Sequence, residues 1–444
     1  MNGSRIISAT ECSMPRIKEK YRVFEHESGL RIYVYPKPMK VTYAVLCVGF
    51  GSIDCDFTDA NGRDIPLPDG TAHFMEHKMF ENSDGTDSFE AFSALGADAN
   101  AYTTYNRTVY MFSCTERLEE CLRELLNFVT HPCFKDESVN RERGIIEQEI
   151  RMYDDNPYSR AHELLMEAMY FESPVRKKVS GTVESISQIT AQTLSDCHKN
   201  FYKTSDMSLV ICGSVNEQSV LGVVDELLPP DNPSVGKRVL SRKAYCEPRR
   251  VRESRIECNM SVSRPILSIG FKLDPTVAAD NTLKRDLAIE LICEVLFSRA
   301  SPLYDTLISR DLVSPSFSAS VNLSQECLMI HVGAETDHPD EVIRIVDEYV
   351  REKQESGFDS EEMERCRRVG YSELVSSFDS TDDIAELLIE GIMYDRNIFD
   401  YVSTVESLDV EYVEWVLRSA LSTEHRSVVI INPEKNPDQE TERN

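Results

Sequence analysis

Four short stretches of sequence recur along the chain at a nearly constant spacing. The paired stretches lie 221 to 224 residues apart and keep their order: VGFGSID (48–54) with IGFKLDP (269–275), FKDE (134–137) with FDSE (358–361), ELL (163–165) with ELL (386–388), and TVES (182–185) with TVES (404–407). One four-residue match arises easily by chance, but four in order at one spacing indicate duplication of a long unit rather than a short-period repeat. We therefore expect two homologous halves.

A proline-rich segment separates the expected halves. Residues 227–250 read LLPPDNPSVGKRVLSRKAYCEPRR, in which prolines are followed by a cluster of basic residues. Such a composition is typical of a linker. The sequence thus predicts an N-terminal half at 1–228, a linker at 229–250 and a C-terminal half at 251–444.

Strand-like and helix-like patterns alternate within the first half. Short apolar runs predict strands at 21–25, 31–35 and 43–50, and longer periodic patterns predict helices at about 70–80, 89–95, 118–130 and 136–152. This alternation favours a layered domain of the α/β or α+β class. We expect the α+β class, with a mixed β-sheet layered with helices in each half.

Charge and cysteine content narrow the classes of function. The chain has 48 Lys and Arg against 76 Asp and Glu, a formal net charge of −28, which disfavours nucleic acid and anionic membranes as partners. Most of this charge is expected to be solvated surface, although acidic residues lining a binding chamber would favour basic peptides. The 13 cysteines include no CxxC pair, and the chain has neither a signal-like apolar run nor a stretch long enough to span a membrane. We expect a cytoplasmic protein.

The segment GTAHFMEHKMF (70–80) contains an H-x-x-E-H motif. On a helix, His73 and His77 lie four residues apart on one face, where both imidazoles can reach one ion. Such nitrogen ligands suit Zn²⁺, and Glu76 on nearly the same side could act as the general base for a metal-activated water. A surface histidine pair without function is the alternative for such spacing taken alone.

A third ligand is expected from the helix-like run RERGIIEQEIRMYDDNP (141–157). Glu142 and Glu149 lie two turns apart on one face, and Ile145, Ile146 and Ile150 flank that face, which predicts that it points inward. Glu149 is the candidate ligand, and Glu142 could orient a ligand or the base. Taken alone, the two glutamates would equally describe a solvated helix face.

HFMEH, followed about seventy residues later by EQEIRMYDDNP, resembles the pitrilysin/insulinase family of zinc peptidases, whose motif inverts the H-E-x-x-H order. The resemblance covers nearly the whole chain, including 180–190 and 201–213, and is greatest to the small bacterial branch related to the mitochondrial processing peptidase. It implies a clam-like subunit of two halves, a zinc ion held by His73, His77 and Glu149, and Glu76 as general base. Glu142 matches the family's second acidic position before the ligand and is counted as a further catalytic residue.

The same resemblance implies where a substrate peptide and a partner subunit bind. The stretch 96–102 resembles the family's edge strand beside the site, along which a peptide adds as a further strand, so that Asn100 and Ala101 would contact substrate. A turn residue is the alternative for Asn100. In the family the second half often supplies an Arg and a Tyr to the substrate carbonyl, but residues 324–341 contain neither. A related subunit carrying both would then complete a heterodimer; a homodimer is the other possibility.

The second half departs from the motif. Aligning Met79-Phe80 with Leu296-Phe297 places Glu290–Glu294 over HFMEH, so both histidines are lost, although Glu373 falls opposite Glu149. The second half is therefore predicted to be non-catalytic.

Two main classes of function remain. The favoured one is a zinc metalloendopeptidase acting on peptides or small unfolded polypeptides. The alternative is a non-proteolytic binding or assembly subunit of a peptidase-like complex. A zinc-stabilised protein without activity is a weaker third class, because structural zinc sites are usually closed and rich in cysteine.

Overall fold

The computed structural model describes residues 5–58, 62–82, 85–238, 241–243, 245–324 and 326–434. The chain forms two compact units that are each assembled from separate segments. Unit 1 comprises Met1–Ile150, Lys178–Ala244 and Glu373–Asp400, and unit 2 comprises Arg151–Lys177, Tyr245–Ser372 and Tyr401–Asn444.

Unit 1 is built on a seven-stranded mixed sheet with the order β1-β2-β3-β9-β4-β8-β7. Its strands are β1 (Ile6–Met14), β2 (Glu19–His26), β3 (Arg31–Pro36), β4 (Thr42–Val48), β7 (Asp98–Thr103), β8 (Thr108–Cys114) and β9 (Met207–Gly213). The central strands β4 (TYAVLCV) and β9 (MSLVICG) are continuous apolar runs, as strands buried on both faces require. Strand β7 pairs only with β8, so it forms one edge of the sheet.

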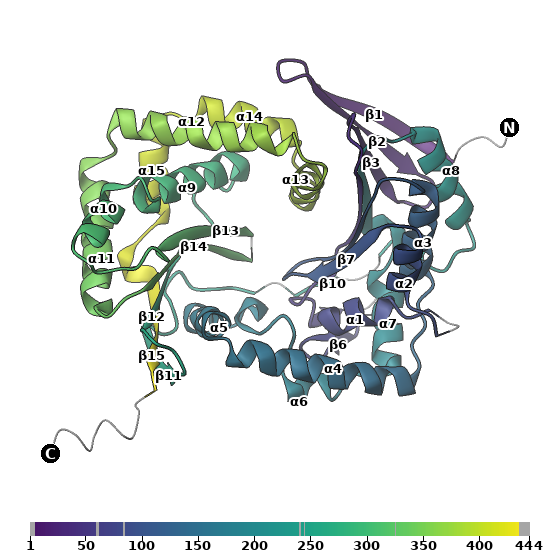
Figure 1. Cartoon of the computed structure of the whole chain (residues 1–444), viewed down its shortest axis with the longest axis horizontal. Coiled ribbons are helices and arrows are strands. Elements are labelled where there is room, and N and C mark those ends of the chain that lie inside the picture. Colours follow the sequence, from purple (N-terminus) through teal and green to yellow (C-terminus); the bar gives the residue numbers. More distant parts are fainter. Residues whose placement is uncertain are drawn as a thin grey trace. The chain divides into compact units, whose positions relative to one another are not determined.

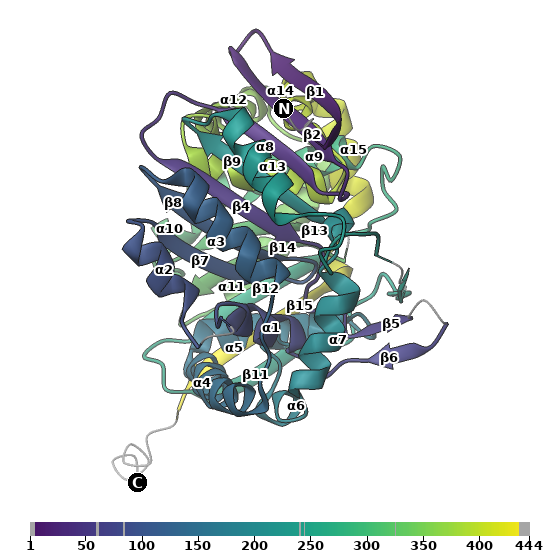
Figure 2. The ribbon, with the colours of Figure 1, turned by 90° about the vertical axis from the view of Figure 1, so that its right-hand side faces the viewer.

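Helices cover both faces of this sheet. On one face Phe112 of β8 stacks against Phe92 of α2 (Ser88–Ala94), and Tyr110 packs edge-on against Phe128 of α3 (Leu118–Thr130). On the other face α13 (Thr381–Met393) packs on β4 and β9. Figures 1 and 2 show α2 and α3 on one side of the sheet, and Figure 1 shows α13 on the other side.

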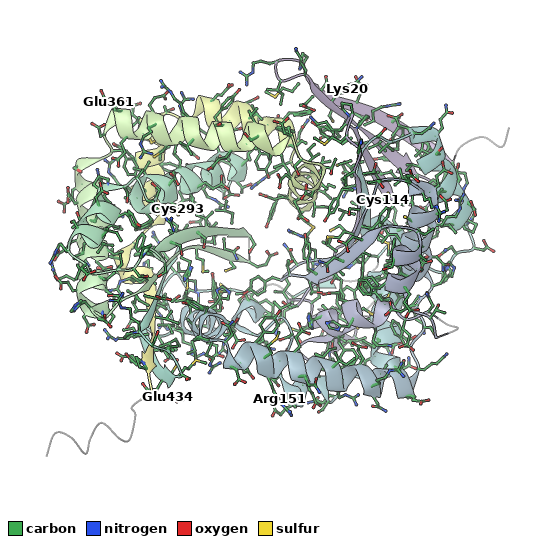
Figure 3. All side chains as sticks on the ribbon, in the orientation of Figure 1. Lys20, Cys114, Arg151, Cys293, Glu361 and Glu434 are labelled. Carbon is green, nitrogen blue, oxygen red and sulfur yellow. The ribbon has the colours of Figure 1, made fainter. Side chains whose placement is uncertain are left out.

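The remaining elements of unit 1 surround this core. They are β5 (Asp56–Thr58), β6 (Asp64–Pro66), β10 (Ser241–Arg242), α1 (Thr71–Met79), most of α4 (Asp136–Asp155), α6 (Val183–Ile186), α7 (Ala191–Phe201), a 3-10 turn (Thr204–Asp206) and α8 (Glu217–Leu227). Strands β10, β5 and β6 form a small separate sheet. Side chains fill the layers between sheet and helices, and the labelled Cys114 lies within one such layer (Figure 3).

Unit 2 repeats the sheet topology of unit 1. Its five strands run β11-β15-β12-β14-β13, with β11 parallel to β15 and all other neighbours antiparallel. In unit 1 the strands β3-β9-β4-β8-β7 have the same order along the chain and the same orientations. The strands are β11 (Arg255–Met260), β12 (Ile266–Lys272), β13 (Ser318–Ser324), β14 (Cys327–Glu335) and β15 (Arg426–Pro433). This shared topology is what the recurring stretches of sequence predict.

The helices of unit 2 come from three segments of the chain, 151–177, 245–372 and 401–444. They are α5 (Pro157–Met169), a 3-10 turn (Pro174–Arg176), α9 (Thr282–Phe297), α10 (Pro302–Ser309), α11 (Pro339–Ser356), most of α12 (Ser360–Ser377), most of α14 (Ile398–Ser407), α15 (Val410–Ala420) and a 3-10 turn (Thr423–His425). Phe271 of β12 stacks on Phe297 of α9, while its neighbour Gly270 faces α5. A Cβ at Gly270 would lie 2.5 Å from Met169 Sδ, so a larger residue there would require the Met169 side chain of α5 to move.

The two compact units are not consecutive stretches of the sequence. Segment 151–177, with α5, belongs to unit 2 although it lies in the first half of the sequence, and segment 373–400, with α13, belongs to unit 1 although it lies in the second half. The two helices carry the recurring ELL stretch, so equivalent helices are exchanged between the units. The mixed sheet layered with helices in each unit confirms the α+β class.

Two residues of the expected linker, one before and one after the undescribed residue 244, make defined contacts. Arg242 pairs with the buried Asp54 of unit 1 at 2.5 Å, and Glu247 accepts hydrogen bonds from three backbone amides of unit 2. All 13 cysteines are free thiols. Across the residues that the structure describes, no helix combines the length and the apolar character needed to cross a membrane.

Candidate metal centre and peptide site

Helix α1 begins where two glycines pack against each other. Gly70, at φ 88°, precedes the helix, and a Cβ there would lie 2.4 Å from Ser180 O. Gly181, at φ 74°, makes the reciprocal approach to Asp69 O, also at 2.4 Å. Only glycine tolerates this backbone conformation and this distance. The stretch SGTVES (180–185) therefore contributes to the site, because it fixes the start of the helix that carries His73 and His77.

The H-x-x-E-H motif lies on one helix, as expected. The rings of His73 and His77 stand 4.7 Å apart between centroids. Helix α4 brings Glu149 to the same place: His73 Nε2 lies 3.6 Å from Glu149 Oε1, and His77 Nε2 lies 3.3 Å from Glu149 Oε2. Among the residues described, these three form the only group of His, Cys, Asp and Glu whose ligand atoms converge, all within 4.8 Å of one another.

The donor set fits a zinc ion. Two ligand atoms of a tetrahedral zinc site, each about 2.1 Å from the metal, stand ~3.4 Å apart, which matches the two separations measured to Glu149. Two imidazoles and one carboxylate are also a ligand set used by catalytic zinc sites, which keep a fourth position open. Both histidines turn Nε2 toward Glu149, which is the orientation that a three-ligand site requires.

Glu142 lies beside this group rather than within it. Its Oε1 stands 3.1 Å from His77 Nδ1, the ring nitrogen that faces away from Glu149. Metal-binding histidines commonly donate their second N–H to a carboxylate in this way, which fixes the tautomer and the ring orientation. Glu142 is thus placed to orient a ligand, the first of the roles that the sequence suggested for it.

The local electrostatics reflect the gathering of carboxylates around the imidazoles. Burial alone would lower the pKa of His77, but its hydrogen bonds with Glu142 and Glu149 outweigh burial and raise this pKa to about 10. The hydrogen bonds with His73 and His77 hold the pKa of Glu149 well below its ordinary value. The arrangement therefore favours a positive charge between the histidines and the carboxylate, which is the charge a divalent cation supplies.

Glu76 is buried between α1 and the edge strand β7. Its side chain accepts a hydrogen bond of 2.6 Å from the hydroxyl of Thr103, the last residue of β7. One carboxylate oxygen is thereby fixed, while Glu76 also lines a pocket. Sequence reasoning missed Thr103, because a threonine at a strand end carries no signal until the strand is placed against the helix.

The pocket has a volume of about 420 Å³ and brings the motif residues together with the expected substrate contacts. Glu76, His77 and Glu142 line it, and so do Asn100 and Ala101 of β7. As expected, β7 is an edge strand. The alternative of a turn for Asn100 is wrong, because Asn100 lies within the strand and pairs with Met111 of β8.

The expectation that Ile145, Ile146 and Ile150 all flank an inward-pointing face is wrong for Ile145. Ile146 and Ile150 are buried as predicted, but Ile145 is 52% exposed and lines the pocket, together with Phe80 and Phe89. An i,i+1 pair on a helix cannot share one direction, so only two of the three isoleucines reach the core. Ile145 instead adds an apolar wall to the pocket that Glu76 lines.

Three charged residues, Lys78, Glu81 and Arg141, connect the end of α1 with α4. The fully buried ammonium of Lys78 bonds the carboxylate of Glu81, whose Oε2 also lies 3.2 Å from Arg141 Nη2. Glu81 and Arg141 line the pocket, and Lys78 directly follows the candidate ligand His77. Glu81 therefore neutralises the buried Lys78. It also links the end of α1 to Arg141 of α4, the residue before Glu142.

Comparisons with known proteins agree with this arrangement. Residues 39–183 match the family model described as "Insulinase (Peptidase family M16)", and residues 188–369 match the one described as "Peptidase M16 inactive domain". Over 409 residues the chain is 34% identical to the uncharacterized zinc protease YmfH of Bacillus subtilis, covering 91% of this chain and 95% of that protein.

Two crystal structures show the same fold. An M16-like peptidase from Alicyclobacillus acidocaldarius has a TM-score of 0.87 and 30% identity, over 95% of this chain and all of that one. Pitrilysin has a TM-score of 0.71 and 19% identity, over 94% of this chain and 45% of its own, and shows the fold alone. On the whole-length relationship to the zinc protease of Bacillus subtilis and the two family models, the chain belongs to the insulinase family of peptidases, M16.

Proposed function

We propose that the protein is a zinc-dependent endopeptidase that hydrolyses peptides or small unfolded polypeptides. The observation that carries this proposal is the convergence of His73, His77 and Glu149 next to a pocket that Glu76 and His77 line together with residues of the edge strand β7. A protein that only binds or assembles has no need for a metal site joined to a general base. The named zinc protease homologue supports the same conclusion.

Each residue of the site has a distinct role in the proposed reaction. His73, His77 and Glu149 would hold the zinc, and Glu142 would orient His77. A zinc ion bound there would polarise the scissile carbonyl and lower the pKa of the attacking water. Glu76, fixed by Thr103, takes the proton from that water and delivers it to the nitrogen of the leaving amine. The peptide pairs with β7 along Asn100 and Ala101, so main-chain hydrogen bonds hold it in register.

The test is the Glu76→Gln variant. We expect it to bind zinc and peptide as the wild type does, because Gln keeps the size and the acceptor for Thr103, and to lose cleavage by at least about 100-fold, the usual contribution of a general base. Zinc content, peptide binding and cleavage are measured on the same preparation. Retained cleavage contradicts the mechanism. A wild type that binds zinc and peptide but cleaves nothing would instead leave the binding-subunit alternative.

We further propose that full activity requires a related subunit. Residues 311–343 contain no Arg and residues 305–348 contain no Tyr, so the region expected to supply both to the substrate carbonyl supplies neither. A homologous chain that carries Arg and Tyr but lacks H-x-x-E-H would complete the site. Size-exclusion chromatography with peptide cleavage tests this: a monomer of this chain alone with full activity refutes it. A cytoplasmic location remains our prediction.

A further inference from the structure

The edge strand β7 is held from both of its faces at two consecutive residues. Side chains alternate along a strand, so Tyr102 and Thr103 point to opposite sides of the sheet. Thr103 donates to Glu76 on the α1 side, at 2.6 Å. On the opposite side the hydroxyl of Tyr102 donates to Glu386 Oε2, at 2.8 Å. The strand that borders the pocket is therefore clamped next to the proposed general base.

The residue on the far side of the clamp comes from the half of the sequence without the zinc motif. Glu386 lies on α13, in segment 373–400, which the structure assigns to unit 1. The helix is anchored on the sheet through its buried Ile384, Ala385 and Leu388. Glu386 is thus presented from a rigid element.

The surroundings of this hydrogen bond make it a strong one. Burial and the nearby Glu386 raise the pKa of Tyr102, so the phenol stays protonated and donates to a charged acceptor. Arg107, which precedes β8, lies beside the phenol and the carboxylate and offsets the charge of Glu386. Hydrogen bonds to ionised acceptors are about twice as strong as neutral ones.

The equivalent glutamate of the second copy is engaged differently. The recurring ELL stretch puts Glu163 of α5 at the position of Glu386, and the carboxylate of Glu163 pairs with Arg160, one turn away on its own helix, at 3.3 Å.

We propose that Glu386 is a positioning residue that, through Tyr102, holds β7 in the conformation in which its free edge pairs with a peptide. The half without the zinc motif would then contribute directly to substrate binding by the catalytic unit. This inference rests on the proposed function in so far as the bound strand is a substrate. The ordering of β7 by Glu386 is independent of any cleavage.

The test is a double-mutant cycle of Tyr102→Phe and Glu386→Ala in the full-length chain. Hydrogen exchange over residues 98–103 is measured first, without peptide. We expect exchange about tenfold faster than in the wild type in each single variant. The double variant should exchange no faster than either single variant, because each change removes the same hydrogen bond. In the zinc-loaded protein the KM for a peptide should rise ~3- to 10-fold with kcat within about twofold, since only the fraction of molecules with β7 ordered binds.

Two further variants separate this role from a general effect on folding. Asp383→Asn removes an equal charge from the exposed face of the same helix, and it should leave both exchange and KM unchanged. Glu386→Gln keeps a hydrogen-bond acceptor and should restore most of the protection.

Three results overturn the proposal: unchanged exchange at 98–103, faster exchange spread evenly over unit 1, or effects of the two changes that add. A fall in kcat with KM unchanged also overturns it, because the role would then lie at Glu76. If the wild type cleaves no peptide, the proposed function fails, and the exchange measurement still decides the role of Glu386.

Discussion

The hydrogen bond between Glu142 and His77 allows a quantitative prediction. In the Glu142→Gln variant the side chain keeps its length and a carbonyl oxygen that can still accept from His77 Nδ1, 3.1 Å from the present acceptor atom. What is lost is the negative charge. Glu142 stands on the far side of the ring from Glu149, so the ligand set itself is intact.

The expected magnitude follows from the two kinds of hydrogen bond. A bond to an ionised acceptor contributes about 1.5–3 kcal/mol and a neutral one about 0.5–1.5 kcal/mol, a difference of roughly 1–1.5 kcal/mol. If that difference appears in the metal-bound state, zinc affinity falls ~5- to 13-fold, since 1.4 kcal/mol is about tenfold. Glu142→Ala leaves Nδ1 without its partner and the ring without orientation, and we expect a loss of ~10- to 100-fold.

The assay is competition for zinc between the protein and a chromophoric chelator at fixed pH and salt. Glu137→Gln is the matched control, because Glu137 is an exposed glutamate on the same helix, and its affinity should equal that of the wild type. An affinity of Glu142→Gln within twofold of wild type, in a protein whose thermal unfolding is unchanged, would refute the reasoning. Glu142 would then be a bystander to the metal.

Three further perturbations have expected outcomes. Glu81→Gln leaves the buried ammonium of Lys78 without its carboxylate and should lower the free energy of unfolding by about 3–5 kcal/mol, whereas combining it with Lys78→Met should recover most of this in denaturant titrations. Thr103→Val removes the donor to Glu76 and should lower kcat by about 3- to 10-fold with zinc affinity unchanged; a change in zinc affinity would argue against it. Burial opposes ionisation of Glu247, but hydrogen bonds from backbone amides and from Lys272 outweigh burial and lower its pKa. Its stabilising contribution is therefore complete above pH 4.5 and is lost as the pH falls through the folded-state pKa. Glu247→Gln should therefore be less stable than wild type near pH 7 but not near pH 2, and an equal deficit at both would contradict this.

Much of the site could be predicted because its parts are local in sequence. Helical periodicity alone places His73 with His77 and Glu142 with Glu149, and the motif predicts zinc as the metal. The structure adds the distances that join the two helices and shows that Glu142 contacts the ring nitrogen of His77 facing away from Glu149. The duplication was likewise visible in short recurring stretches, which fall on equivalent strands and helices.

The features that escaped prediction depend on tertiary placement. Helices α5 and α13 share the recurring ELL stretch, so no local pattern reveals which sheet each one covers, and the sequence does not predict their exchange between the units. For the same reason Glu386 could not be assigned to β7. Thr103 and the exposed Ile145 acquire their surroundings only when α1, α4 and β7 are placed together.

The central claim is that one zinc ion held by His73, His77 and Glu149 makes this protein a peptidase. Metal-free protein, prepared with a chelator and mixed with the partner subunit if the isolated chain is inactive, is titrated with zinc while peptide hydrolysis is followed. The account predicts no hydrolysis without metal and a linear rise that ends at one equivalent of zinc per chain, with the rise abolished by His77→Ala. Hydrolysis by the metal-free protein, or an unchanged titration curve in His77→Ala, would contradict it.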